Sequence, residues 1–169
     1  MLKLLKIIAI VMVLMSATAF AAAANAVLGA SEFLTEAQKS YGRHDYKQAL
    51  MLFHQAADLG SPDAQYMTAL MIYRGEGGIV SDPAEAARYY TLAANNNLPK
   101  AQYNLAVLYY QGAGVDRNDV EAYKWLYLAT LKGEPRAMDM LPVADRNLAA
   151  DQKAQAISEA HSFQIVGNS

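Results

Sequence analysis

The clearest repeated segment of the chain is Ala101-Gln102-Tyr103-Asn104-Leu105-Ala106-Val107-Leu108-Tyr109, followed by Gly112-Ala113-Gly114-Val115. Its opening triplet already occurs at residues 64–66, 37 positions earlier, and Tyr73-x-Gly75-x-Gly77 returns as Tyr110-x-Gly112-x-Gly114 at the same interval. One residue, opposite Gly78, is then missing, and the spacing falls to 36. A period of this size is typical of proteins that stack copies of one supersecondary unit.

Each copy predicts a pair of helices. Apolar residues recur at the 3.6-residue period in both halves, for example at Leu105 and Leu108 and then at Trp125 and Leu126. Prolines at residues 62, 99 and 135 mark successive starts. The pattern predicts helices over residues 31–41, 45–59, 62–74, 83–96, 99–111, 119–132, 135–143 and 149–162.

Residues suited to helix ends repeat with the same period. The predicted N-caps are Asp45, Asp82 and Asn118, with capping-box partners three residues later at Gln48, Glu85 and Glu121. Left-handed helix ends are predicted at Gly60, Asn97, Gly133, Gly75 and Gly112. The fold class is therefore all-α, with about four antiparallel helix pairs. Full repeats are expected over residues 61–98 and 99–134, and partial terminal units over 31–60 and 135–162.

The unit at Ala101–Val115, continued by Ala122-x-x-Trp125, resembles the Sel-one-like repeat (SLR) family, a relative of the tetratricopeptide repeats. Thr68 and Ile72 depart from the Leu and Tyr of the family motif, and the last unit lacks its glycine loop. The resemblance, which covers about residues 42–162, implies a right-handed α–α superhelix. It also implies an inner surface that binds proteins or peptides, often in a periplasmic adaptor or regulator.

The first 26 residues have the three-part pattern of a secretory signal peptide. Lys3 and Lys6 precede an apolar run, and small residues follow it. Cleavage after Ala21 or Ala26 fits the small-x-small rule, and we favour Ala26, which leaves a repeat domain at residues 27–169. The alternative is an uncleaved anchor in the inner membrane, since Ile7–Ala24 approaches the length of a spanning helix. The expected location is the periplasm or outside the cell.

Composition excludes several classes of function. The chain has 14 Lys and Arg against 16 Asp and Glu, and two of the lysines lie in the signal segment, which leaves 12 against 16, a net charge of −4. Such a balance argues against nucleic acid as a partner, because that affinity comes largely from basic groups. The absence of cysteine excludes disulfides, thiolate metal sites and cysteine catalysis.

The sequence offers no catalytic or metal-binding constellation. His44, His54 and His161 form no ligand pair at helical spacing. The glycine loops lack Gly-Lys-Ser/Thr and follow helices rather than strands, so they are not phosphate loops. No Gly-x-Ser-x-Gly elbow occurs. Cysteine-rich relatives are described as binding or hydrolysing β-lactams, but this chain lacks their cysteines. We therefore expect no enzyme activity, no metal and no cofactor.

The tyrosines are the main candidates for a binding surface. Tyr66 and Tyr73 are seven residues apart, hence on one helix face, and Tyr103 and Tyr110 repeat that pair. We expect a two-by-two patch on the inner wall, in which Tyr66 and Tyr103 pack between helices and Tyr73 and Tyr110 are exposed. Hydrogen bonds beside them are expected from Gln65, Gln102 and Asn104. Phe53, Tyr89 and Trp125 are assigned to the core.

The sequence thus predicts an exported helical-repeat protein that acts as an adaptor or regulator through a protein or peptide partner. Two alternatives stay open. One is a cell-wall or β-lactam hydrolase of the same repeat family, and the other is a sensor tethered to the inner membrane. The oligomeric state cannot be predicted from the sequence.

Overall fold

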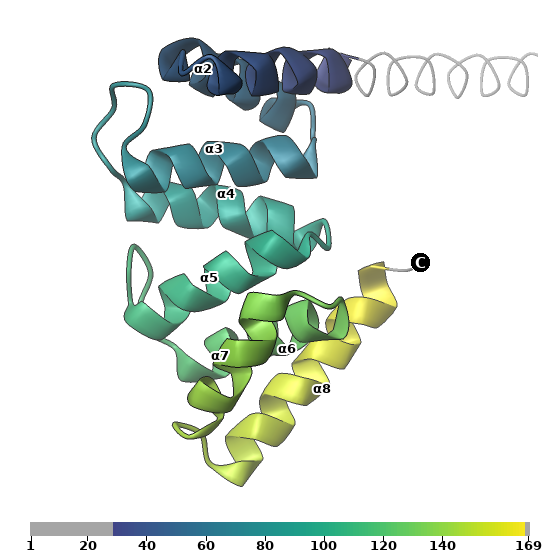
Figure 1. The fold of residues 1–169 in the computed structure, drawn as a ribbon. Coiled ribbons are helices and arrows are strands. Elements are labelled where there is room, and N and C mark those ends of the chain that lie inside the picture. Colours follow the sequence, from purple (N-terminus) through teal and green to yellow (C-terminus); the bar gives the residue numbers. More distant parts are fainter. Residues whose placement is uncertain (1–28, 168–169) are drawn as a thin grey trace, which may run out of the picture.

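The computed structural model describes residues 29–167, and these form helices joined by turns (Figure 1). A helix over residues 29–42 is followed by α2 (Tyr46–Asp58), α3 (Pro62–Arg74), α4 (Pro83–Asn95), α5 (Pro99–Gln111), α6 (Asp119–Leu131), α7 (Pro135–Asp145) and α8 (Ala150–Gly167). No strand occurs in this range, which confirms the all-α prediction. The predicted signal segment lies outside the described residues.

Consecutive helices from α2 to α7 pack side by side, and the units stack in the order of the sequence (Figure 1). Helices α3 and α4 form one pair and α5 and α6 the next, while α4 packs on α5 and α6 packs on α7. The helices approach closely because alanine fills the contacts. Fully buried alanines recur in each unit, at positions 49, 56, 64, 69, 86, 93, 101, 106, 122 and 129. Larger side chains such as Phe53, Trp125 and Leu126 complete the core, as expected for the first two.

The predicted N-caps are confirmed. The Asp45 carboxylate accepts from the Gln48 amide, the Asp82 carboxylate from the Ala84 and Glu85 amides, and the Asn118 side chain from the Val120 and Glu121 amides. Left-handed φ values at Gly60, Asn97, Gly133, Gly75 and Gly112 confirm the predicted helix ends. These side chains and turns satisfy backbone groups that a helix terminus leaves unpaired.

The reciprocal half of the predicted capping boxes is wrong. In place of a side chain from Gln48, Glu85 or Glu121, the N-cap amides bind carbonyls of the preceding helix. Asp45 N donates to Ser40 O at 3.0 Å, Asp82 N to Ile72 O at 3.2 Å, and Asn118 N to Tyr109 O at 3.0 Å. Each of these three N-cap residues is therefore hydrogen-bonded through its backbone to the helix before it. Glu121, released from capping, accepts from Trp125 Nε1 at 3.0 Å.

The last unit departs from a regular hairpin, because α8 packs on α6 rather than lying along α7. Phe163 of α8 meets Trp125 of α6 edge to face, with ring centroids 5.3 Å apart. Ala156 and Ala160 of α8 are also fully buried. Helix α8 thus covers the side of α6 that would otherwise face solvent at the end of the stack.

Candidate functional site

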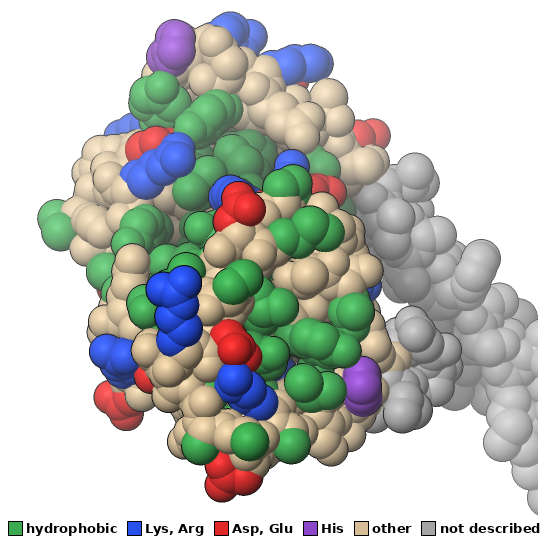
Figure 2. All heavy atoms as spheres, turned by 60° about the horizontal axis from the view of Figure 1, so that its bottom comes forward, with side chains coloured by type: hydrophobic (Ala, Val, Ile, Leu, Met, Phe, Trp, Pro, Cys, Tyr) green, Lys and Arg blue, Asp and Glu red, His purple; other side chains and the backbone are tan. Residues whose placement is uncertain are grey.

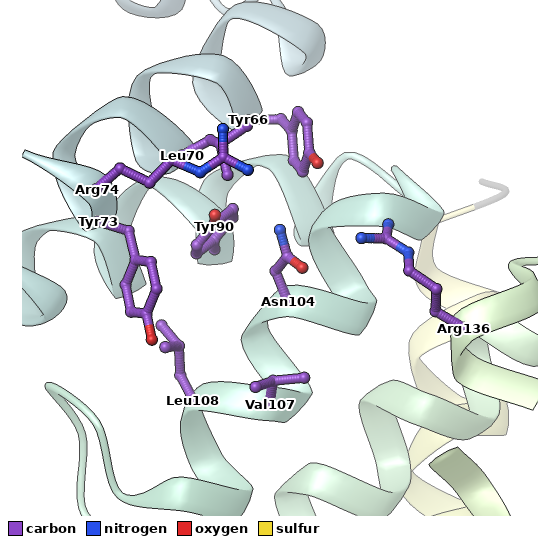
Figure 3. Close-up of a pocket in the computed structure, with 9 residues that line it drawn as sticks. All are labelled: Tyr66, Leu70, Tyr73, Arg74, Tyr90, Asn104, Val107, Leu108 and Arg136. Carbon is purple, nitrogen blue, oxygen red and sulfur yellow. The ribbon is translucent and has the colours of Figure 1, made fainter. Parts of the chain in front are cut away.

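A pocket opens where α3, α5 and α7 come together, and we call this surface the α3–α5–α7 face. The pocket has a volume of about 220 Å³. It is lined by Tyr66, Leu70, Tyr73, Arg74, Tyr90, Asn104, Val107, Leu108 and Arg136 (Figure 3). Hydrophobic side chains also gather in a hollow across the middle of the molecule in Figure 2, with Lys and Arg side chains at its edge.

The floor of the pocket is aromatic and fixed. Tyr90 of α4 is 2% exposed, and its ring lies 5.9 Å from that of Tyr66. Burial raises the pKa of Tyr90 well above its usual range, against a smaller opposite effect of a hydrogen bond with Asn104. The Tyr90 hydroxyl therefore stays protonated at physiological pH. The Asn104 side chain extends from α5 toward Tyr90 (Figure 3).

Arg136 of α7 closes one side of the pocket. Its Nε donates to the Glu134 carboxylate at 2.7 Å, and its guanidinium lies 4.5 Å above the Tyr103 ring. The hydrogen bond with Glu134 is the largest cause of a raised Arg136 pKa, and Tyr66 also contributes. Tyr103 is thereby covered by α7 and does not line the pocket. The guanidinium points from α7 toward Asn104 (Figure 3).

The predicted two-by-two tyrosine patch is divided between two environments. Tyr66 and Tyr73 line the pocket, and Tyr73 is exposed as expected. Tyr110 is half-buried instead of exposed, with Arg117 over its ring at 5.5 Å and Asn147 donating to its hydroxyl at 3.4 Å. The cause is the last unit, in which Arg136 of α7 covers Tyr103 and Asn147, in the turn after α7, contacts Tyr110.

Gln65 and Gln102 lie elsewhere than predicted, because both are buried between helices. Gln102 Nε2 donates to the Ala94 carbonyl at 3.2 Å, and Gln65 Nε2 donates to the Ala57 carbonyl at 3.4 Å. Each glutamine joins the start of one pair to the end of the helix before it. These amides hold the stack together and leave Asn104 as the polar candidate at the pocket.

No group of three His, Cys, Asp or Glu residues in the described range could hold a metal ion. The histidines instead pair with tyrosines, as where His54 Nδ1 lies 3.0 Å from the Tyr89 hydroxyl. Tyr89, expected in the core, is half-buried because this hydrogen bond holds it at the core's edge. Within residues 29–167 no helix combines the length and apolar character needed to cross a bilayer. The arrangement can bind a side chain by shape, aromatic contact and charge.

The Sel1 repeat family matches residues 22–61, 62–98 and 99–134, which together are more than half of the chain. The chain belongs to the Sel1 repeat family. This confirms the resemblance to Sel-one-like repeats, and the stack of helix pairs described above is the fold of that family. No curated protein matches the sequence significantly.

Solved structures of Sel1 repeat proteins are similar to this one. A protective antigen of uropathogenic Escherichia coli with an SLR fold superposes with a TM-score of 0.74 at 25% identity, over 79% of this chain and 29% of its own. A Sel1 repeat protein from Oxalobacter formigenes gives 0.64 at 27% identity, over 70% and 92%. Cysteine-rich protein B of Helicobacter pylori gives 0.53 at 24% identity, over 56% and 70%, a likeness of fold alone. The chain thus spans less than a third of the E. coli antigen.

Sequence reasoning missed most of the pocket. Arg136 occupies the position that Lys100 holds in the preceding unit, directly after the first proline of its helix. This match to the repeat pattern is the sequence signal that places Arg136 on the same face as Tyr66. Tyr90 and Arg74 have no equivalent tyrosine or arginine in the next unit, where Leu126 and Gln111 stand, so repetition gave no signal for them.

Proposed function

We propose that this Sel1 repeat protein is an adaptor or regulator that binds a segment of a partner protein at the α3–α5–α7 face. The observation that carries the proposal is the pocket itself, with buried Tyr90 as its floor and exposed Tyr73 at its edge. Aromatic side chains provide large contact areas at a small cost in conformational entropy, and they are enriched where binding energy is concentrated. The proposed activity is noncovalent and uses no cofactor.

The repeat architecture supports this function. A stack of helix pairs exposes an extended surface while each unit contacts only its neighbours. Pockets of such a surface form between helices of successive units, as this one forms between α3, α5 and α7. Here the stack is short, so we propose a compact binding surface for one partner segment.

Affinity capture with crosslinking tests the proposal. The wild-type protein, Tyr73→Ala and Leu92→Ala serve as baits, since Tyr73 and Leu92 are exposed by 37% and 47% but only Tyr73 lines the pocket. We expect the same partner with wild type and Leu92→Ala, and a loss of at least fivefold with Tyr73→Ala. Equal capture by all three baits would rule out binding at this face.

We further propose that the protein is exported, on the basis of the signal-peptide pattern in residues 1–26. Sequencing the amino terminus of the protein from the periplasmic fraction and the culture medium tests this. The expected first residue is Val27 or Ala22, according to the cleavage site. An intact Met1 in membrane-bound protein would instead favour the tethered form.

A further inference from the structure

The size of the pocket limits what can enter it. Its volume of about 220 Å³ lies below the range of roughly 300–1,000 Å³ typical of small-molecule sites. A single large side chain fits such a space. The apolar walls come from Leu70 of α3 and from Val107 and Leu108 of α5. This lining favours an apolar or aromatic side chain over a polar one.

The charged residues that line the pocket are all positive. Arg74 and Arg136 line it from α3 and α7, and none of its lining residues is Asp or Glu. The acids nearest to the two arginines are their ion-pair partners outside the lining, Glu76 and Glu134. In Figure 3 the Arg74 guanidinium extends beside Leu70 toward Tyr66, and that of Arg136 reaches toward Asn104 from the opposite side.

Both arginines retain capacity for another carboxylate. Arg74 pairs with Glu76 only at 3.5 Å, and its side chain is 52% exposed. Arg136 uses its Nε for Glu134 and also forms a hydrogen bond with Tyr66, and a guanidinium has five N–H donors, so donors remain for a further acceptor. Guanidinium groups bind carboxylates in a bidentate manner, which adds specificity to the charge attraction. A ligand that brings acidic groups to both sides of the pocket therefore complements the surface.

We propose that the partner segment recognised here is acidic, with one apolar or aromatic side chain entering the pocket and Asp or Glu residues on both sides of it meeting Arg74 and Arg136. The inference rests on the proposed binding function and specifies the chemistry of its ligand. The side chain provides the apolar contact, and the flanking carboxylates orient the segment along the face between α3 and α7.

Synthetic peptides test the inference with the full-length protein. The probes are fluorescein-labelled nine-residue peptides of sequence Gly-Ser-Asp-Glu-X-Glu-Asp-Ser-Gly, with Leu, Met, Phe, Tyr or Trp as X. One control series replaces each acid by its amide, and a second has Gly as X. Fluorescence anisotropy measures binding at low and at high salt.

Charge-neutralising variants locate the binding. Arg74→Gln removes an exposed cation from the pocket, and Arg146→Gln removes an exposed cation of the same kind that does not line it. Arg136→Lys keeps the charge beside Glu134, which makes it safer for folding than Arg136→Gln, and removes the bidentate geometry. Circular dichroism checks that each variant is folded.

We expect tightest binding for an acidic peptide with a large X, a loss of about fivefold with Arg74→Gln, and no change with Arg146→Gln. Binding should weaken as salt rises, because the flanking contacts are exposed. If amide and acidic peptides bind equally, or if no peptide binds while Tyr73→Ala still abolishes partner capture, the inference fails and the proposed function stands. If Tyr73→Ala changes neither peptide binding nor capture, both fail.

Discussion

Gly114 shows how closely successive units approach one another. A Cβ atom at this position would lie 2.3 Å from the Pro83 carbonyl carbon and 2.4 Å from the Ala84 nitrogen, at the start of the preceding unit's second helix. Its φ of +73° also disfavours any other residue. The second glycine of the repeated loop is thus required by contact with backbone as well as by the turn.

We predict that Gly114→Ala destabilises the protein far more than Gly78→Ala. Gly78 has a φ of +84° and no heavy atom within 4 Å of the built Cβ, so its variant incurs only the backbone cost of about 1 kcal/mol. Gly114→Ala must also move backbone, and we expect at least about 3 kcal/mol. Urea unfolding of both variants measures the difference. Equal losses would mean that the close approach is absent in solution.

A second residue-scale prediction concerns the two buried glutamines. Gln65 makes two hydrogen bonds, donating to Ala57 O and accepting from Asn96, whereas Gln102 Oε1 has no partner among the described residues. An unpaired buried acceptor is unfavourable, so replacing Gln102 removes a cost as well as a bond. Gln65→Met should therefore cost about 1 kcal/mol more than Gln102→Met in chemical denaturation. The reverse order would show that Gln102 is paired in solution.

At the scale of the element, the helix starts differ in how they are capped. The side chains of Asp82 and Asn118 bind amides of the first turn, while α5 and α7 begin after Leu98 and Glu134 without such a bond and have proline in the first turn instead. Proline there removes one amide that would need a partner. In the second full unit, α5 and α6 thus start by different means, whereas α3 and α4 of the first full unit each combine a side-chain cap with a proline.

We predict that Asp82→Ala lowers the free energy of unfolding by about 1 kcal/mol, because two amides lose their acceptor. Glu85→Ala should cost only a few tenths, since Glu85 makes no capping-box bond and acts on the helix dipole alone. Thermal melts of both variants, with Asp82→Asn as the conservative control, give the comparison. If Glu85→Ala lowered the free energy of unfolding as much as Asp82→Ala, Glu85 would have to form the capping box in solution.

Helix α8 acts as the terminal cover of the stack, and its contact with α6 can be followed directly. Trp125 is the only tryptophan of the chain and is 6% exposed beside Phe163. Phe163→Ala should destabilise the protein by about 2 kcal/mol and shift the tryptophan emission to longer wavelength. Ser162→Ala, one position earlier and exposed, is the control. Unchanged emission in the Phe163 variant would show that α8 does not cover Trp125.

For the molecule as a whole, the sequence predicted the fold well because its determinants are local and repeated. Caps, helix-ending glycines and apolar periodicity each occur two or three times at fixed spacing, and each copy supports the same boundaries. The helices α3 and α5 were predicted with the bounds that the structure shows. Local signals that agree with the overall fold in this way are typical of sequences that fold to one structure.

The site was predicted only in part, because the pocket is formed by contacts between helices of successive units and not by the residues of a single repeat. The seven-residue spacing placed Tyr66 and Tyr73 together correctly, and Asn104 also lines the pocket. The exposure of Tyr103 and Tyr110 depends on α7, which belongs to the unit with the weakest repeat signal. Arg136 of α7 covers Tyr103. The burial of Gln65 and Gln102 follows from helix contacts that spacing does not reveal.

Site-specific photocrosslinking in the producing cell tests most directly whether the α3–α5–α7 face binds a partner. A photoreactive phenylalanine analogue replaces Tyr73 in the pocket or Leu92 on α4, outside it, and adducts are identified by mass spectrometry. We predict a discrete adduct from position 73, attached next to an acidic stretch of the partner, and none from position 92. Adducts from position 92 alone would contradict the claim that the α3–α5–α7 face binds the partner.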